Sequence, residues 1–291
     1  MRKVLSAVSV LAVLSAVVAT TSAPGASRSA AAIPGCSAGS LNLLTAGTLT
    51  VGADNPAFPP WFGGTEKKPW KVSDPYSGKG YESAVTYAIA KQLGFAKSAV
   101  KWTYVPFSNS FRPGKKPFDV YITQVSITPE RAKAVTFSKP YYYVNQAVVG
   151  RKGKPIASVR SVAGLKKYKL GAQLGTTSYQ YIVDHIKPSS QPLVYKTNDL
   201  AVQALKNGLI DGLVVDLPTA FYVTAVQVSD GTIVGQFPSG ASKEGFGLVL
   251  AKGNPLVTCV NKAIDRLWTN GTIKTLQRIW LAKATGAPVL K

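Results

Sequence analysis

The hydrophobic and polar residues of this chain change their spacing repeatedly, and each spacing predicts a different element. Runs rich in β-branched residues predict strands, and apolar residues three or four positions apart predict helices. Strands are expected over 47–54, 100–107, 119–127, 169–175, 193–197, 211–216 and 244–251, with a longer β-rich stretch over 135–153. Helices are expected over 81–95, 161–168, 176–186, 198–210, 217–226, 255–271 and 272–282, with a further helix starting at Thr128. This alternation predicts an α/β fold whose mainly parallel sheets are covered by helices.

The first apolar segment has a different meaning, because Arg2 and Lys3 precede the run VLSAVSVLAVLSAVVA and small residues follow it. This is the layout of a secretory signal peptide. Residues 1–32 are assigned to it, with cleavage expected between 23 and 32, and residues 33–40 to a flexible tail. A retained membrane anchor is the second interpretation, although the run is short for a spanning helix. The protein is therefore expected to be exported: secreted, periplasmic or associated with the cell surface, and peripheral to the membrane.

The formal net charge is +21 at neutral pH, which raises the possibility of nucleic-acid binding. The basic residues are scattered in pairs such as Lys67-Lys68 and Lys115-Lys116, and no nucleic-acid-binding motif accompanies them. We therefore expect no nucleic-acid partner. A solvated surface that is attracted to an anionic cell envelope is the preferred interpretation.

The chain has two cysteines, Cys36 and Cys259, and one histidine, His185. So few soft ligands argue against a structural zinc site and a histidine-based triad, and we expect neither a metal nor a cofactor. An exported protein with an even number of cysteines favours a disulfide. Lipidation of Cys36 is the alternative, although Pro34 is a poor neighbour for it.

The predicted helix at Thr128 carries a cation where the helix dipole opposes one. Thr128 can cap the helix, Pro129 suits its first position, and Glu130 complements the positive end of the dipole. Arg131 in the same turn either reaches into water or has another partner that stabilises its charge.

Several polar residues follow predicted strands in both halves of the chain. Asp54 follows the strand at 47–54, Thr176 and Thr177 follow 169–175, and Asp216 ends 211–216. Ligands of parallel α/β sheets bind outside the carboxyl ends of strands. These residues therefore predict a ligand cleft between two lobes.

Five segments in a fixed order carry a family resemblance: GKGYESAVTYAIAKQLGF, SITPERAKAVTFSKPYY, KLGAQLGTTSYQY, GLIDGLVVDLPTAFY and FGLVLAKGNPL. Together they resemble the family 3 extracellular solute-binding proteins, the amino-acid-binding components of ABC importers, from about Leu41 to Leu281. The resemblance implies a two-lobed periplasmic-binding-protein-like fold of type II, with two hinge strands and a ligand cleft between the lobes. Residues 41–145 and 240–291 would form the first lobe and 146–239 the second, with crossings near 144–151 and 239–245.

The resemblance also implies roles in the cleft. Arg131 sits where the family's arginine holds the ligand α-carboxylate, and a guanidinium fork suits that group. Ser126 would add hydroxyl or backbone contacts, and Thr177 would offer a helix N-terminus. Asp216 matches the carboxylate that receives the ligand ammonium, and Phe107 an aromatic that packs over the ligand. The remaining candidate pocket residues are Asp54, Phe58, Gln124, Gln173 and Thr176.

Each of these positions also has a purely structural interpretation. Asp216 and Thr177 can be helix caps, Phe107 a core residue, and Ser126 a hydroxyl at a strand end. Gln124 stands where many relatives have glycine, and Gln173 where some have lysine. On that basis we expect a pocket less suited to a long cationic or amide side chain.

The function that the resemblance implies is capture of a free amino acid or related zwitterion and its delivery to an ABC permease, by a monomer without enzymatic activity. The same fold also resembles exported cyclohexadienyl dehydratases, which need a general acid or base at the reacting atoms. The carboxylates expected near the cleft, Asp54 and Asp216, are already assigned to ligand anchoring. A third possibility is a ligand-sensing receptor component that acts through a separate partner.

Overall fold

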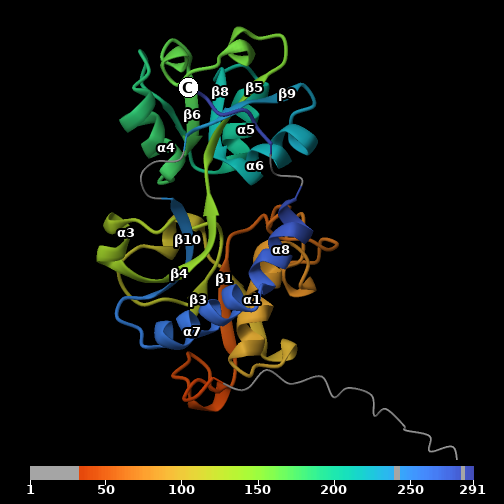
Figure 1. Cartoon of the computed structure of the whole chain (residues 1–291), viewed down its shortest axis with the longest axis vertical. Coiled ribbons are helices and arrows are strands. Elements are labelled where there is room, and N and C mark those ends of the chain that lie inside the picture. The colour runs from red at the N-terminus through yellow and green to blue at the C-terminus, as the bar shows by residue number, and fades with distance from the viewer. Residues whose placement is uncertain (1–32, 239–242, 283–285) are drawn as a thin grey trace, which may run out of the picture. The chain divides into compact units, whose positions relative to one another are not determined.

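The structure is a computed structural model that describes residues 33–238, 243–282 and 286–291. The predicted signal peptide lies outside the described residues. Two five-stranded sheets, each with its own helices, form the framework (Figure 1). We call the part built on the sheet β2-β1-β3-β10-β4 the first lobe, and the part built on β7-β6-β8-β5-β9 the second lobe. The mixed α/β architecture with two sheets confirms the predicted fold class.

The first lobe combines segments from both ends of the described chain. Its strands are β1 (Leu49–Ala53), β2 (Val100–Tyr104), β3 (Val120–Tyr121), β4 (Val135–Val144) and β10 (Glu244–Ala251). Its helices are α1 (Tyr81–Gln92), α2 (Phe107–Ser110), α3 (Pro129–Ala134), α7 (Leu256–Thr269) and α8 (Thr272–Leu281). β1 pairs in parallel with β2 and β3, whereas β10 runs antiparallel to β3 and β4. The carboxyl ends of β1, β2 and β3 therefore meet at one edge of the sheet.

The second lobe repeats this design with the middle of the chain. Its strands are β5 (Gln146–Arg151), β6 (Leu170–Gln173), β7 (Leu193–Tyr195), β8 (Gly212–Asp216) and β9 (Gly231–Gln236). Its helices are α4 (Thr177–Tyr181), α5 (Asn198–Lys206) and α6 (Leu217–Tyr222), and wider turns extend α4 over Ile182–Ile186 and α6 over Val223–Gln227. β6, β7 and β8 are parallel, and β5 is antiparallel to β8 and β9.

The chain passes from the first lobe to the second between β4 and β5. β4 of the first sheet leads through Asn145 into β5 of the second. The return from β9 to β10 includes residues 239–242, which lie outside the described residues.

The C-terminal segment makes a further passage that the sequence did not predict. The return to the first lobe was expected to extend over residues 240–291, but residues 288–291 lie along β9 of the second lobe. Val289 forms a parallel bridge with Gln236, and Leu290 is 1% exposed within the second lobe's core. A Cβ atom at Gly235 would lie 2.7 Å from Leu290 Cγ, so the strand needs glycine where the segment docks.

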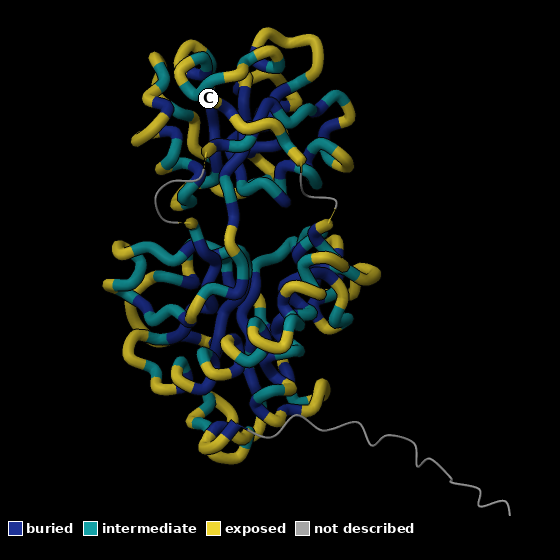
Figure 2. The backbone as a smooth tube through the Cα atoms, viewed as in Figure 1, coloured by how far each residue is buried: buried dark blue, intermediate teal, exposed yellow. Residues whose placement is uncertain are grey.

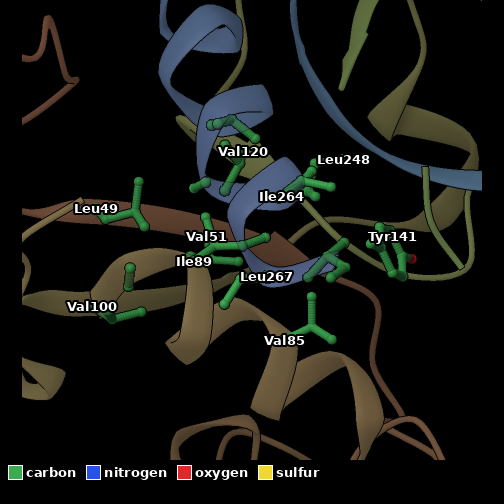
Figure 3. Packing of buried hydrophobic residues seen from close by; sticks show 14 of the residues in the cluster. Leu49, Val51, Val85, Ile89, Val100, Val120, Tyr141, Leu248, Ile264 and Leu267 are labelled. Atoms are coloured by element: carbon green, nitrogen blue, oxygen red, sulfur yellow. The ribbon is translucent and has the colours of Figure 1, made fainter. Parts of the chain in front are cut away.

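Each lobe has its own hydrophobic core, and burial follows the strands (Figure 2). In the first lobe, Val85 and Ile89 of α1 and Ile264 and Leu267 of α7 gather around Leu49 and Val51 of β1 (Figure 3). α7 has its buried residues at helical spacing, so one face packs on the sheet and the other faces solvent. These cores hold the strand ends that carry the pocket.

Residues 33–40 differ from the expected flexible tail. Ile33 and Cys36 are 4% and 2% exposed and belong to the core of the first lobe. A disulfide joins Cys36 to Cys259 on α7, as the cysteine count favoured over lipidation. The bridge fixes the beginning of the described chain to the helix that follows the return to this lobe.

Some expected elements also differ in extent. The helix expected over 161–168 is only a short 3-10 turn at Ala163–Leu165, and the strand expected over 119–127 is confined to Val120–Tyr121. β9 was not predicted, although its run of three β-branched residues, 232–234, is compatible with a strand. Among the described residues, no helix has both the length and the apolar character that crossing a membrane requires.

Candidate functional site: a polar pocket between the lobes

A pocket of about 280 Å³ lies where the strand ends of the two lobes face each other. Its lining follows the carboxyl ends of β1, β2 and β3 in the first lobe and of β6, β7 and β8 in the second. All ten candidate ligand residues from the sequence line it: Asp54, Phe58, Phe107, Gln124, Ser126, Arg131, Gln173, Thr176, Thr177 and Asp216. The structure thus brings the predicted residues together, and their contacts with a ligand remain a proposal.

Arg131 lies in the first turn of α3, which Thr128 caps as the sequence indicated. The Thr128 hydroxyl accepts a hydrogen bond from the Arg131 N–H at 3.2 Å, and Pro129 begins α3. The guanidinium donates to Ser126 O in the first lobe and to Gly175 O in the second, both at 2.8 Å. It also lies 4.5 Å from the centre of the Phe111 ring. These acceptors are neutral, and among the described residues no salt bridge joins Arg131 to a carboxylate.

Enclosure by protein changes the electrostatics of Arg131. Burial lowers the pKa of its guanidinium to about 10, and the nearby carboxylate of Glu244 opposes this shift. A cation that is desolvated and contacts only neutral acceptors is strongly stabilised by an anion placed beside it. Three of its five N–H donors are not used by the two carbonyl contacts. Arg131 is therefore suited to bind a carboxylate that enters the pocket.

Asp216 stands on the second lobe, where β8 ends and α6 begins. Its carboxylate accepts the Thr219 N–H at 3.0 Å and so caps α6, which does not exclude a contact with a ligand. Burial raises the pKa of Asp216 to about 6, although the hydrogen bonds from Thr219 lower it. A carboxylate has about four acceptor positions, so the hydrogen bonds from Thr219 leave capacity for another donor. An ammonium beside Asp216 would stabilise its charged form.

The remaining lining brings aromatic rings and further charges to the pocket. Phe58 of the first lobe contacts Tyr222 of the second, with ring centres 5.8 Å apart. Burial raises the pKa of Asp54, and its carboxylate accepts the Asn55 N–H at 2.8 Å. Two lining charges, Lys196 and Asp199, were not predicted from the sequence. They follow β7, so the rule that placed Asp54 and Asp216 at strand ends would also have found them.

Gln124, which lines the pocket, has an unusual backbone conformation. Its φ is +43°, in the left-handed region where glycine is favoured and other residues are strained. Its backbone N–H and its side-chain amide both donate to the carboxylate of Glu82. These two bonds offset the strain of the left-handed backbone at this position.

Glu82 lies behind Gln124 of the pocket lining and accepts hydrogen bonds from it. It is fully buried and also accepts a hydrogen bond from the Tyr141 hydroxyl. Burial raises its pKa to about 7, and the hydrogen bonds oppose that shift. Glu82 is not among the residues that line the pocket.

Glu244 is a further residue at this site that sequence reasoning missed. It begins β10, directly after the return crossing, and its carboxylate contacts the side chains of Ser126, Thr177 and Gln146. No local motif marks it, because its partners lie 118, 67 and 98 residues away in the chain. Among the described residues, no group of three or more His, Cys, Asp or Glu side chains is arranged to hold a metal ion.

Two α/β lobes that share a polar pocket at their strand ends define a binding protein whose ligand lies between the lobes. The chain belongs to the bacterial extracellular solute-binding proteins, family 3, whose profile matches residues 49–283. This membership confirms the resemblance seen in the sequence.

Relatives with assigned ligands are similar over most of the chain. The L-cystine-binding protein TcyJ of Escherichia coli K12 is 29% identical over 249 residues, which cover 84% of this chain and 85% of TcyJ. The ABC transporter arginine-binding protein 1 of the same organism is 27% identical over 213 residues, which cover 69% of this chain and 81% of that protein. An ancestral arginine-binding protein, solved with bound arginine, is 32% identical and superposes with a TM-score of 0.64 over 80% of this chain and 98% of its own.

One structural neighbour relates to the enzyme alternative. It is an ancestral amino-acid-binding protein described as a precursor of cyclohexadienyl dehydratase. It is 27% identical, with a TM-score of 0.65 over 80% of this chain and 95% of its own. Because the relatives are mostly binding proteins, these similarities favour binding over catalysis.

Proposed function

We propose that the protein captures a free amino acid in the pocket between its lobes and delivers it to the permease of an ABC importer. The observation that carries this proposal is the presence of Arg131 and Asp216 in one pocket, with no salt bridge to either among the described residues. An amino acid supplies an α-carboxylate for the first and an ammonium for the second. Each contact would pair a desolvated charge, which is where charge-assisted hydrogen bonds are strongest.

The charges of the lining narrow the ligand class. Asp54, Asp199 and Asp216 outnumber the cations Arg131 and Lys196, so the lining carries an acidic excess. A ligand with an acidic side chain would add like charge to this field, whereas a neutral or cationic side chain would not. We therefore propose a neutral or cationic amino acid. Asp199 counts against the expectation from the sequence that a long cationic side chain is disfavoured.

Binding without catalysis is part of the proposal. Glu82 has a pKa suited to a general acid or base near neutral pH. Hydrogen bonds from Tyr141 and Gln124 occupy its carboxylate, and the pocket lining does not include it. Formation of phenylpyruvate or phenylalanine from prephenate or arogenate would contradict this part of the proposal. We also propose that the protein acts as an exported monomer, and a receptor role would need a separate partner.

The test begins with a thermal-shift screen of the twenty common amino acids and L-cystine, because a ligand that binds only the native state raises the melting temperature. Calorimetric titration of Arg131→Ala and Asp216→Asn follows with the amino acid that gives the largest shift. Each substitution should weaken binding by about 2 to 5 kcal/mol, since it leaves a ligand charge desolvated and unpaired. That loss corresponds to about 30-fold to several thousand-fold in affinity.

Two surface substitutions are matched controls. Lys133 is on the same helix as Arg131, and its side chain is 74% exposed. Asp265 on α7 has a side chain that is 51% exposed. Lys133→Ala and Asp265→Asn should bind like the parent. Binding by folded Arg131→Ala or Asp216→Asn within threefold of the parent would refute that residue's role.

A further inference from the structure

The carboxylate of Glu244 is the point where side chains of both lobes meet beside the pocket. Glu244 Oε1 lies 2.5 Å from Ser126 Oγ of the first lobe and 2.7 Å from Thr177 Oγ1 of the second. Gln146 Nε2, at the start of β5 in the second lobe, donates to Glu244 Oε2 at 3.0 Å. Ser126, Thr177 and Gln146 all line the pocket, whereas Glu244 lies behind them and is not part of the lining.

These contacts determine the direction of two hydroxyl groups. A carboxylate only accepts hydrogen bonds, and a serine or threonine hydroxyl has a single proton to donate. Ser126 and Thr177 therefore both direct their protons at Glu244, and they present lone pairs to the pocket. Neither hydroxyl proton is then available to a ligand carboxylate, which leaves that role to Arg131 and to backbone N–H groups.

Arg131 and Glu244 bridge the same two segments with opposite charges. Arg131 donates to the carbonyls of Ser126 and Gly175, and Glu244 accepts from the hydroxyls of Ser126 and Thr177. The second lobe's Gln146 is held in place from its other end, because the Ser178 hydroxyl donates to Gln146 Oε1 at 2.6 Å. The two charged residues thus tie the first lobe to the second on one side of the pocket.

The geometry points to Glu244 as a positioning residue for ligand binding. It stabilises the arrangement in which the lobes meet around the pocket, and it keeps the Ser126 and Thr177 hydroxyl protons away from the ligand. Its effect on affinity rests on the proposed function. Its effect on the contact between the lobes does not need a ligand.

Three variants separate the possible roles of Glu244. Glu244→Ala removes the shared acceptor, and we expect affinity for the amino acid found in the screen to fall about 10- to 100-fold, as for loss of hydrogen bonds to a charged group. Glu244→Gln removes the charge but keeps an oxygen that can accept from both hydroxyls. Its affinity for the amino acid should therefore fall less than about tenfold. Lys243→Ala, an exposed neighbour, is the matched control and should bind like the parent.

A double substitution tests whether Glu244 acts through the hydroxyls. Thr177→Val keeps the shape of the side chain and removes its proton. If the two residues act together, Glu244→Ala with Thr177→Val should bind no more than about threefold more weakly than Glu244→Ala alone. If Thr177→Val alone weakens binding and its loss adds in full to that of Glu244→Ala in the double variant, the two residues act independently and the proposal is overturned. Equal affinities of Glu244→Ala and the parent would overturn it, as would tighter binding by Glu244→Ala or equal losses in the alanine and glutamine variants.

Small-angle scattering without added amino acid provides a test that needs no ligand. Glu244→Ala should give a larger radius of gyration than the parent and Lys243→Ala, because fewer molecules have the lobes in contact. Identical profiles for folded parent and Glu244→Ala would overturn the role of Glu244 between the lobes. If none of the screened amino acids binds the parent, the proposed function fails while this comparison still decides the role of Glu244.

Discussion

Glu82→Gln is the substitution that most directly tests the electrostatics behind the pocket lining. Glu82 is fully buried, and burial raises its pKa from an ordinary value of 4.5 to about 7. The native state therefore binds this proton more tightly than the unfolded chain does. Its contribution to stability is fully present below pH 4.5 and is lost as the pH rises through about 7.

The size of the effect follows from the pKa difference. Each pKa unit corresponds to about 1.4 kcal/mol, so a shift from 4.5 to about 7 is worth on the order of 3 kcal/mol. Glutamine does not titrate, and its oxygen can accept from Tyr141 and from the Gln124 N–H as Glu82 does. The Gln124 side-chain amide can turn its own oxygen toward the new N–H group. The free energy of unfolding of Glu82→Gln, relative to that of the parent, should therefore rise by on the order of 3 kcal/mol as the pH increases from about 4.5 to about 8.

The assay is urea unfolding of parent and variant at about pH 4.5, 6 and 8, monitored by tryptophan fluorescence. Asp216 titrates in both proteins, so its contribution cancels in the difference to first order. Glu130→Gln is the control, because the side chain of Glu130 is 81% exposed and should show no such gain. A constant difference between parent and Glu82→Gln across the three pH values would refute a raised pKa at Glu82.

Two further predictions concern the covalent and packed connections of the chain. Replacing Cys36 and Cys259 together by serine should lower the free energy of unfolding by about 2 to 5 kcal/mol, because the bridge closes a loop of 223 residues in the unfolded chain; equal urea midpoints for oxidised parent and variant would contradict this. Leu290→Ala should lower the free energy of unfolding by about 2 kcal/mol or more, since it leaves a cavity in the core of the second lobe. Val289→Ala, at a position 57% exposed, is the control, and equal melting temperatures for the two variants would show that docking at position 290 contributes little.

Much of the fold was predictable, because the strongest sequence patterns coincide with the best-packed elements. α1 forms within the stretch expected over 81–95, and β8 within 211–216. The pocket residues were found because a family motif surrounds Arg131 and because parallel strands present their carboxyl ends to a common edge. These are local signals that need no knowledge of distant contacts.

The features that the sequence did not reveal depend on contacts between distant segments. Glu244 is an ordinary charged residue at a strand start until folding brings Ser126 and Thr177 to it. The docking of Leu290 depends on the space above Gly235, which no local pattern shows. The expected helix over 161–168 is only a short turn at Ala163–Leu165, whose Leu165 is buried in the core of the second lobe.

The docked C-terminal segment has a practical consequence for observing this protein at work. Leu290 fixes residues 288–291 to the second lobe, whereas the exposed Lys115 lies between α2 and β3 of the first. A fluorescent protein joined after Lys291 would follow the second lobe, and a dye on a cysteine placed at Lys115 would follow the first. Energy transfer between the two would report lobe movement in real time, with no label in the pocket itself.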